Sequence, residues 1–219
     1  MQERPANNFG IAFFLAILFA IANGIVLLVL GKFETFQLIN SHYTSILDQF
    51  FKYFTHYGDG IMWAPLALFC IFFRKKYFIA VLAGAIISTI IAQVLKRVVF
   101  PDELRPIKYL AENFPVHVIS GVEMRTSHSF PSGHTTTAFT MALIMAHMIN
   151  KRIWSVILPV LALLAGYSRV YLAQHFPTDI FAGMCIGIVS AMLALIIYKA
   201  ISKKINEKIS SKLKSAAPA

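Results

Sequence analysis

The feature that most constrains this chain is a series of apolar runs, some of them long enough to cross a membrane. A helix needs about 20 predominantly apolar residues to span the hydrocarbon core, and residues 9–30 and 77–99 meet that length. Of the 219 residues, 58% are hydrophobic and only 14% are charged, whereas a soluble domain carries about a quarter charged residues. Because the excess apolar surface has to face lipid, the pattern predicts an all-α polytopic membrane protein.

We expect six transmembrane helices in a single domain that covers residues 1–200. The spans are predicted at residues 9–30, 61–73, 77–99, 135–149, 153–172 and 180–200. The second is short, and it would have to tilt little or thin the bilayer locally. Of the two long connections, residues 31–59 and 100–132, the second contains four prolines and is too polar to lie in lipid. A Lys-rich tail, residues 201–219, is expected to rest on the cytoplasmic membrane surface.

The distribution of charge predicts which side of the membrane each connection faces. The N-terminus, Arg74–Lys76, Lys151-Arg152 and the chain from Lys199 through the tail contain twelve of the twenty Lys and Arg residues, with only two acidic residues. The other eight basic residues are matched by eight acidic ones. Basic loops stay in the cytoplasm, so we expect both termini inside a bacterial inner or plasma membrane. This placement also accounts for the formal charge of +10 without a nucleic-acid partner.

Three polar stretches interrupt the apolar pattern, each at a helix end that is expected to face outward. They are Lys96-Arg97 with Arg105-Pro106, then Pro131-Ser132-Gly133-His134, and finally Ser168-Arg169 with His175 and Asp179. Ionisable residues at membrane depth are unfavourable, and by default they indicate function. We therefore expect these helix ends to meet at one site, although their residues are up to 83 positions apart.

The basic residues of these stretches are suited to binding phosphate. Lys96 or Arg97, together with Arg105 and Arg169, would supply at least three positive charges. Guanidinium groups match phosphate oxygens with two parallel hydrogen bonds. The stretches therefore predict an anion site at the outward helix ends.

A helix start and two histidines add the groups that a transfer reaction needs. Ser132 and Gly133 precede a predicted helix, where a capping hydroxyl and free backbone N–H groups favour an anion. His175 and Asp179 are four positions apart, so the carboxylate can hold one imidazole nitrogen and leave the other to attack phosphorus. His134 can protonate the departing oxygen. The set requires no metal or other cofactor, and none is expected.

The three stretches resemble the three motifs of the type 2 phosphatidic acid phosphatase family, whose superfamily also contains vanadium haloperoxidases. The second and third motifs match at every defined position. The resemblance implies a helical core, metal-independent hydrolysis of lipid phosphates or diphosphates, and a phosphohistidine intermediate. It also implies roles for individual residues: His175 as nucleophile, His134 as acid, Asp179 orienting His175, and Lys96, Arg105, Ser132, Gly133 and Arg169 binding phosphate.

The first motif departs from the family pattern. The family usually leaves six residues between its Lys and Arg-Pro, whereas eight follow Lys96 and seven follow Arg97. Either the helix ends in a longer turn, or Arg97 shares the role. Neighbours on a helix point about 100° apart, so only one is expected to contact phosphate, and Lys96 is favoured. Ser168 stays open as a further candidate, because its hydroxyl can instead bond back to its own helix.

Three functions remain open on the sequence alone. The first is a lipid phosphatase, with undecaprenyl diphosphate preferred over phosphatidylglycerophosphate, lipid A and phosphatidic acid because a lipid carrier has to be recycled on the outer face. The second is a phosphotransferase that passes the same phosphoryl group to a lipid or sugar hydroxyl. The third is a transporter that binds a lipid phosphate without chemistry. The expected partners are the lipid substrate and membrane lipids, and the sequence does not indicate an oligomeric state.

Overall fold

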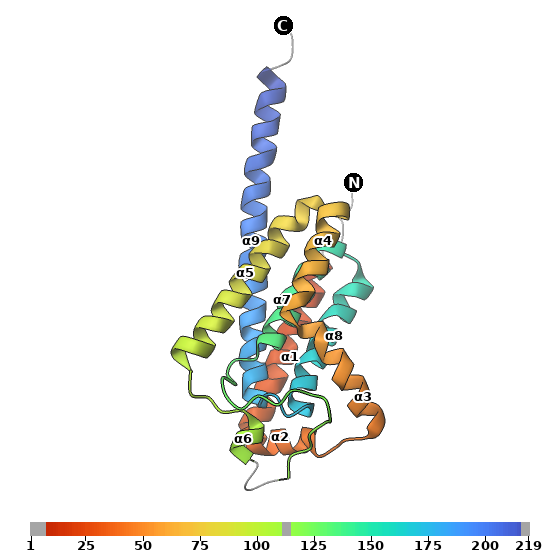
Figure 1. Ribbon diagram of the computed structural model, residues 1–219. Coiled ribbons are helices and arrows are strands. Elements are labelled where there is room, and N and C mark those ends of the chain that lie inside the picture. The colour runs from red at the N-terminus through yellow and green to blue at the C-terminus, as the bar shows by residue number, and fades with distance from the viewer. Residues whose placement is uncertain (1–7, 111–114, 216–219) are drawn as a thin grey trace.

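The computed structural model describes residues 8–110 and 115–215 as a bundle of helices (Figure 1). All regular secondary structure in these two ranges is helical, which confirms the predicted all-α class. The α-helices are α1 (Phe9–Leu30), α2 (Lys32–Asn40), α3 (Ser45–Phe54), α4 (Trp63–Phe73), α5 (Phe78–Val94), α6 (Pro106–Leu110), α7 (Gly133–Ile149), α8 (Arg152–Tyr171) and α9 (Pro177–Ser215). Shorter segments are the 3₁₀ turns η1 (Thr55–Gly58), η2 (Gly60–Met62) and η3 (Lys75–Tyr77), and the π-helical turn η4 (Leu95–Val99).

Four helical segments among the described residues are long and apolar enough to cross a membrane. They are Phe9–Leu30, Lys75–Val99, Arg152–Tyr171 and Pro177–Lys208. A fifth crossing results if Ser45–Gly58 and Gly60–Phe73, which are bent by 55°, form one broken span. The expected short span at residues 61–73 is the second half of that bent pair. The expected span at residues 135–149 lies in α7, which has only 17 residues. The chain is an integral membrane protein, and its six-span count stays a prediction.

Helix α7 forms the centre of the bundle. It contacts α1, α5, α8 and α9, and every side chain from Thr135 to Ile144 is buried. Small residues allow the neighbouring backbones to approach closely. A Cβ atom on Gly183 of α9 would come within 2.8 Å of the Ser132 carbonyl oxygen. This close approach places the start of α7 directly beside the start of α9, where the second and third motifs meet.

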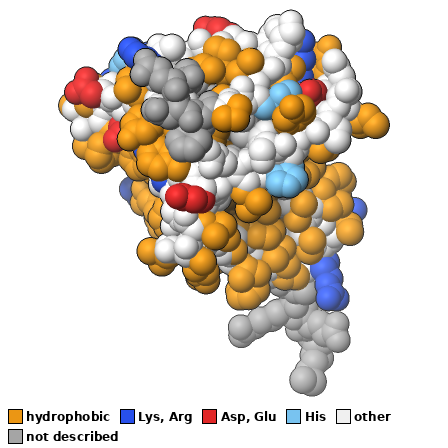
Figure 2. All heavy atoms as spheres, turned by 90° about the horizontal axis from the view of Figure 1, so that it is seen from below, with side chains coloured by type: hydrophobic (Ala, Val, Ile, Leu, Met, Phe, Trp, Pro, Cys, Tyr) orange, Lys and Arg blue, Asp and Glu red, His pale blue; other side chains and the backbone are white. Residues whose placement is uncertain are grey.

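The flank of the bundle is apolar. Large hydrophobic side chains are exposed along α1, α4 and α5, among them Leu28, Phe72 and Ile90. Figure 2 views the bundle from below, and it shows acidic, basic and histidine side chains interspersed with hydrophobic ones on that end and mainly hydrophobic side chains beyond it. A surface of this kind is suited to contact with lipid along the helices and with water at the ends.

Both ends of the described chain lie at one end of the bundle, and the long connections lie at the other (Figure 1). The α4–α5 and α7–α8 turns, which carry Arg74–Lys76 and Lys151-Arg152, are at the same end as the termini. This is the grouping that the charge pattern predicts. The tail continues α9 without a break to Ser215 rather than forming a separate surface helix. The terminal residues 1–7 and 216–219 lie outside the described residues, and so do residues 111–114 of the predicted 100–132 connection.

Candidate active site

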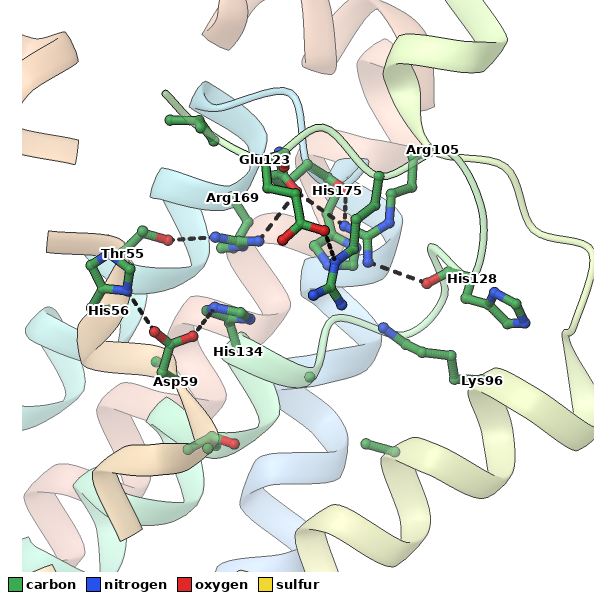
Figure 3. Close-up of a pocket in the computed structure, with 18 of the residues that line it drawn as sticks. Thr55, His56, Asp59, Lys96, Arg105, Glu123, His128, His134, Arg169 and His175 are labelled. Carbon is green, nitrogen blue, oxygen red and sulfur yellow. Dashed lines mark hydrogen bonds and ion pairs between the residues drawn. The ribbon is translucent and has the colours of Figure 1, made fainter. Parts of the chain in front are cut away.

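The three motifs surround one cavity of about 1000 Å³ at the loop end of the bundle. Its lining combines the end of α5, the segment from η1 to η2, the loop at residues 121–128, the start of α7 and the α8–α9 link. The predicted site residues in the lining are Lys96, Arg97, Arg105, Gly133, His134, Arg169 and His175. The structure thus brings together side chains from all three motifs, as Figure 3 shows for the labelled residues.

His175 lies in the short link between α8 and α9, with 1% of its surface exposed. Its Nδ1 is 3.1 Å from Asp179 Oδ2. The same carboxylate oxygen accepts hydrogen bonds from the Ser129 hydroxyl and, at 3.0 Å, from the Phe176 backbone N–H. Because three groups hold this carboxylate oxygen, the imidazole orientation is fixed through Nδ1. Nε2 is then the ring nitrogen that is left for chemistry.

The surroundings of His175 favour its neutral form. Burial, and then the positive charges of Arg105 and Lys96, lower the pKa of His175 well below its usual value of 6.5. An imidazole with a lowered pKa is uncharged at neutral pH, and only the uncharged ring has a nitrogen lone pair for nucleophilic attack.

Two buried guanidinium groups flank this histidine. Arg105 donates to the carbonyl oxygens of Ser127 at 3.0 Å and Gln174 at 2.9 Å. Burial, followed by the charge of another arginine, lowers the pKa of Arg105 to about 10, so the group stays positive at neutral pH. Arg169 donates to the Thr55 hydroxyl at 2.6 Å, but its buried Nε has no hydrogen-bond partner among the described residues. An anion in the cavity could accept from that donor.

Two predicted serines do not line the cavity. The hydroxyl of Ser132 is buried and accepts from the Thr135 hydroxyl at 3.0 Å and from its N–H at 3.4 Å, so it caps α7. Ser168 donates to the Ala165 carbonyl oxygen at 2.7 Å, which is the local helix bond left open above. The Ser132 N–H donates to the carbonyl oxygen of Asp179 at 3.0 Å, so this residue ties the second motif to the third.

The first motif, with its unusual spacing, begins in an irregular end of α5. Lys96 and Arg97 lie in the π-helical turn η4, and single π turns insert a residue into an α-helix, frequently at functional sites. Both side chains line the cavity. Arg97 Nε donates to Gln93 Oε1 at 2.9 Å, whereas Lys96 extends toward Arg105 and His175 (Figure 3). That Lys96, rather than Arg97, contacts phosphate stays a prediction.

Asp59 also lies in the cavity lining, although no sequence pattern had indicated it. Its Oδ1 is within hydrogen-bonding distance of His134 Nε2, and its Oδ2 is 2.6 Å from His56 Nδ1 (Figure 3). The available signal was a carboxylate between Gly58 and Gly60 at the start of an apolar run. Its partner in α7 is 75 positions away, and no local pattern connects the two. Thr55 and Gln174 were missed for the same reason.

The arrangement is suited to moving a phosphoryl group. It provides a neutral imidazole fixed by a carboxylate, a second imidazole beside another carboxylate, and several cations around the cavity between them. Positive groups fixed around a phosphoryl group stabilise its transition state without reorganisation. Among residues 8–110 and 115–215, no three His, Cys, Asp or Glu side chains are grouped so that they could hold a metal ion.

Comparisons with known proteins show which family this chain belongs to. The model of the PAP2 superfamily matches residues 76–203. Undecaprenyl-diphosphatase of Sulfolobus acidocaldarius is 29% identical over 157 residues, which cover 70% of this chain and 72% of that protein. Lipid A 4'-phosphatase of Porphyromonas gingivalis is 26% identical over 164 residues, covering 70% of this chain and 67% of that protein.

A solved structure agrees with this assignment. LpxE of Aquifex aeolicus is 34% identical, with a TM-score of 0.67, over 75% of this chain and 94% of that one. The segment matched by the family contains all three motifs and the residues around the cavity, from Lys96 to Asp179. The chain therefore belongs to the PAP2 superfamily.

Proposed function

We propose that this PAP2 enzyme hydrolyses a lipid phosphate or diphosphate through a phosphohistidine intermediate on His175, at the non-cytoplasmic face of the membrane. The observation that carries the proposal is the placement of His175. Its Nδ1 is held by Asp179 at 3.1 Å, and its ring lies in the lining of a cavity shared with Lys96, Arg105 and Arg169. A fixed neutral nucleophile among cations is the arrangement that phosphoryl transfer requires.

In the first half of the proposed reaction, His175 Nε2 attacks phosphorus. The new N–P bond forms as the P–O bond to the leaving group breaks, and His134 gives a proton to the departing oxygen, which belongs to the lipid alcohol in a monophosphate and to the lipid monophosphate in a diphosphate. The arginine and lysine side chains balance the charge on the phosphoryl oxygens. In the second half, water attacks phosphorus, the N–P bond breaks, and a proton of the water passes to His134. Inorganic phosphate then leaves, and both histidines return to their starting states.

Undecaprenyl diphosphate is the preferred substrate in this proposal. Two relatives are named for different lipids, undecaprenyl diphosphate and lipid A, so phosphatidylglycerophosphate, phosphatidic acid and lipid A stay as alternatives. The cavity of about 1000 Å³ is larger than one phosphate group needs, and it extends to Ser88, Thr89 and Ala92 of α5. The neighbouring Ile86 and Ile90 are exposed on the apolar flank. A lipid tail could therefore follow α5 while its phosphate lies near His175.

The test is a ranking of kcat/KM for phosphate release from these four lipids by the purified protein in detergent with EDTA. We expect undecaprenyl diphosphate to rank first, release to persist in EDTA, and His175→Gln to abolish it. Acid-labile labelling of His175 by a ³²P-lipid should appear in single-turnover samples. Transfer of the labelled phosphoryl group to an added acceptor lipid, with no release of inorganic phosphate, would indicate a transferase instead. Lipid movement that survives His175→Gln, with no release by the unaltered protein, would contradict the proposal.

A further inference from the structure

Asp59 joins two histidines at the edge of the cavity. Its two carboxylate oxygens face different partners, Oδ1 the Nε2 atom of His134 and Oδ2 the Nδ1 atom of His56. His56 is the most exposed of the three residues. Its side chain is 66% exposed, whereas those of Asp59 and His134 are 28% and 26% exposed. The carboxylate is therefore fixed from the solvent side by one imidazole and directed at the other (Figure 3).

The backbone around Asp59 is shaped for this contact. Asp59 follows η1, which packs against α7 and α8. A Cβ atom on Gly58 would lie 2.9 Å from the His134 carbonyl oxygen and 3.0 Å from its Cβ. Contacts this short require glycine, so η1 reaches α7 only because position 58 has no side chain. The first residue of η1, Thr55, accepts from Arg169, so one short segment contacts both the second and the third motif.

The charge at position 59 opposes the other influences on His134. Burial and the positive charges of Arg169 and Lys96 lower the pKa of His134 to about 4, and the Asp59 carboxylate acts in the opposite direction, favouring a proton on this imidazole. A residue that protonates a departing oxygen has to carry its proton when the substrate arrives. Among the described residues in contact with His134, Asp59 is the only carboxylate.

We propose that Asp59 is the positioning residue of the acid His134, holding Nε2 so that Nδ1 faces the departing oxygen. The inference rests on the function proposed above. The N–P and P–O bond changes are those already given, and Asp59 itself neither gains nor loses a proton. His56 orients the carboxylate from the solvent side. How much the reaction depends on Asp59 and His134 is set by the leaving group. An alkoxide needs a proton as the P–O bond breaks, and a nitrophenolate does not.

The experiment compares Asp59→Asn with the unaltered protein on two phosphate monoesters, dioctanoyl phosphatidic acid and 4-nitrophenyl phosphate. Asparagine keeps the size of the side chain and its acceptor oxygen but removes the charge. We expect kcat/KM to fall about 100-fold for phosphatidic acid, within the usual range for an acid catalyst, and less than about fivefold for the nitrophenyl ester. His134→Ala should likewise lower kcat/KM much more for phosphatidic acid than for the nitrophenyl ester. The double variant with Asp59→Asn should lower kcat/KM little further than His134→Ala alone.

Three controls separate the possible explanations. Asp102→Asn removes an exposed carboxylate that does not line the cavity, and it should leave both rates unchanged. Asp59→Glu restores the charge and should recover part of the phosphatidic acid activity. Thermal unfolding monitors the fold of each variant. Equal losses on both esters, or no loss, would overturn the role of Asp59. If His175→Gln kept its activity, or if the unaltered protein released phosphate from none of the four lipids named above, the proposed function itself would fail.

Discussion

The chemistry proposed for His175 depends on its protonation state, which its surroundings set. Burial and the charges of Arg105 and Lys96 hold the pKa of His175 below 6.5, so the ring is neutral above that pH and becomes protonated only in more acidic solution. Activity should therefore be lost as pH falls through the lowered pKa, and not as it rises. We expect the acid limb of kcat/KM that belongs to His175 to lie below pH 6.5.

A substitution that changes the charge around His175 separates this limb from the ionisation of the substrate. Lys96→Met removes a positive charge, which raises the pKa of His175 and should move the acid limb to higher pH. Lys75→Met, in the turn η3 between α4 and α5, should not move it. A limb that stays in place in Lys96→Met, or moves to lower pH, would contradict the electrostatic account.

Arg169 should contribute mainly to the transition state. Its Nη1 donates to the Thr55 hydroxyl, and its buried Nε is left without a partner among the described residues, so the donor is positioned before the substrate arrives. Removal of one such preorganised donor typically lowers kcat by about 100- to 1000-fold, and we expect this for Arg169→Ala. Vanadate, a mimic of phosphoryl transfer, should inhibit the unaltered protein and bind Arg169→Ala much more weakly. Arg152→Ala, at the far end of α8, is the matched control and should change neither value.

At the scale of elements, the η1 segment controls how the bent α3–α4 pair meets α7. Gly58→Ala would place a Cβ atom 2.9 Å from the His134 carbonyl oxygen, whereas a Cβ on Gly60 would meet nothing within 4 Å. Overpacking of this kind typically destabilises by about 1–3 kcal/mol. Gly58→Ala should therefore lower the Tm and the rate of phosphatidic acid hydrolysis, and Gly60→Ala should preserve both. Equal behaviour of the two variants in detergent would show that the close approach is unimportant.

The sequence predicted the elements that a local pattern can specify. Apolar runs indicated α1, α5, α8 and α9 because length and composition decide whether a helix can cross a lipid layer. The motif residues around His134 and His175 were found because their spacing is short and defined. The expected span at residues 61–73, by contrast, missed its continuation through η1 into α3. That segment contains polar residues such as Asp48 and Lys52, so composition alone did not mark it as part of a bent pair.

The site features that the sequence did not predict arise from contacts between distant segments. Asp59 pairs with His134, and Thr55 with Arg169, yet neither pair has a regular spacing that a sequence pattern could reveal. The extra length of the first motif is likewise not specified by a local sequence pattern. Eight residues follow Lys96 before Arg105, and the π turn at Leu95–Val99 depends on how α5 packs, which local propensity does not determine. Long-range packing therefore completes a site whose reactive groups were recognisable beforehand.

For the whole molecule, the separation of charge determines how a lipid could reach the cavity. The segments that line the cavity lie at the end of the bundle opposite the described ends of the chain (Figure 1). The excess of basic residues lies with those chain ends, in Arg74–Lys76, Lys151-Arg152 and the tail. Because basic loops stay in the cytoplasm, the cavity should open to the other side, toward lipids of the outer leaflet.

This orientation can be tested with single cysteines. Cys70 and Cys185 lie within α4 and α9, and both are replaced by alanine in the parent protein. Single cysteines are then introduced as Ser41→Cys, at an exposed position of the loop end, and as Asn206→Cys, at an exposed position of the tail. A membrane-impermeant maleimide should label position 41 in intact cells, and position 206 only after the cells are permeabilised. The reverse pattern would place the cavity in the cytoplasm, and hydrolysis by His175 would then act on inner-leaflet lipids. Labelling of both positions in intact cells would mean that the two ends do not lie on opposite sides of the membrane, and the bundle would not span it as a unit.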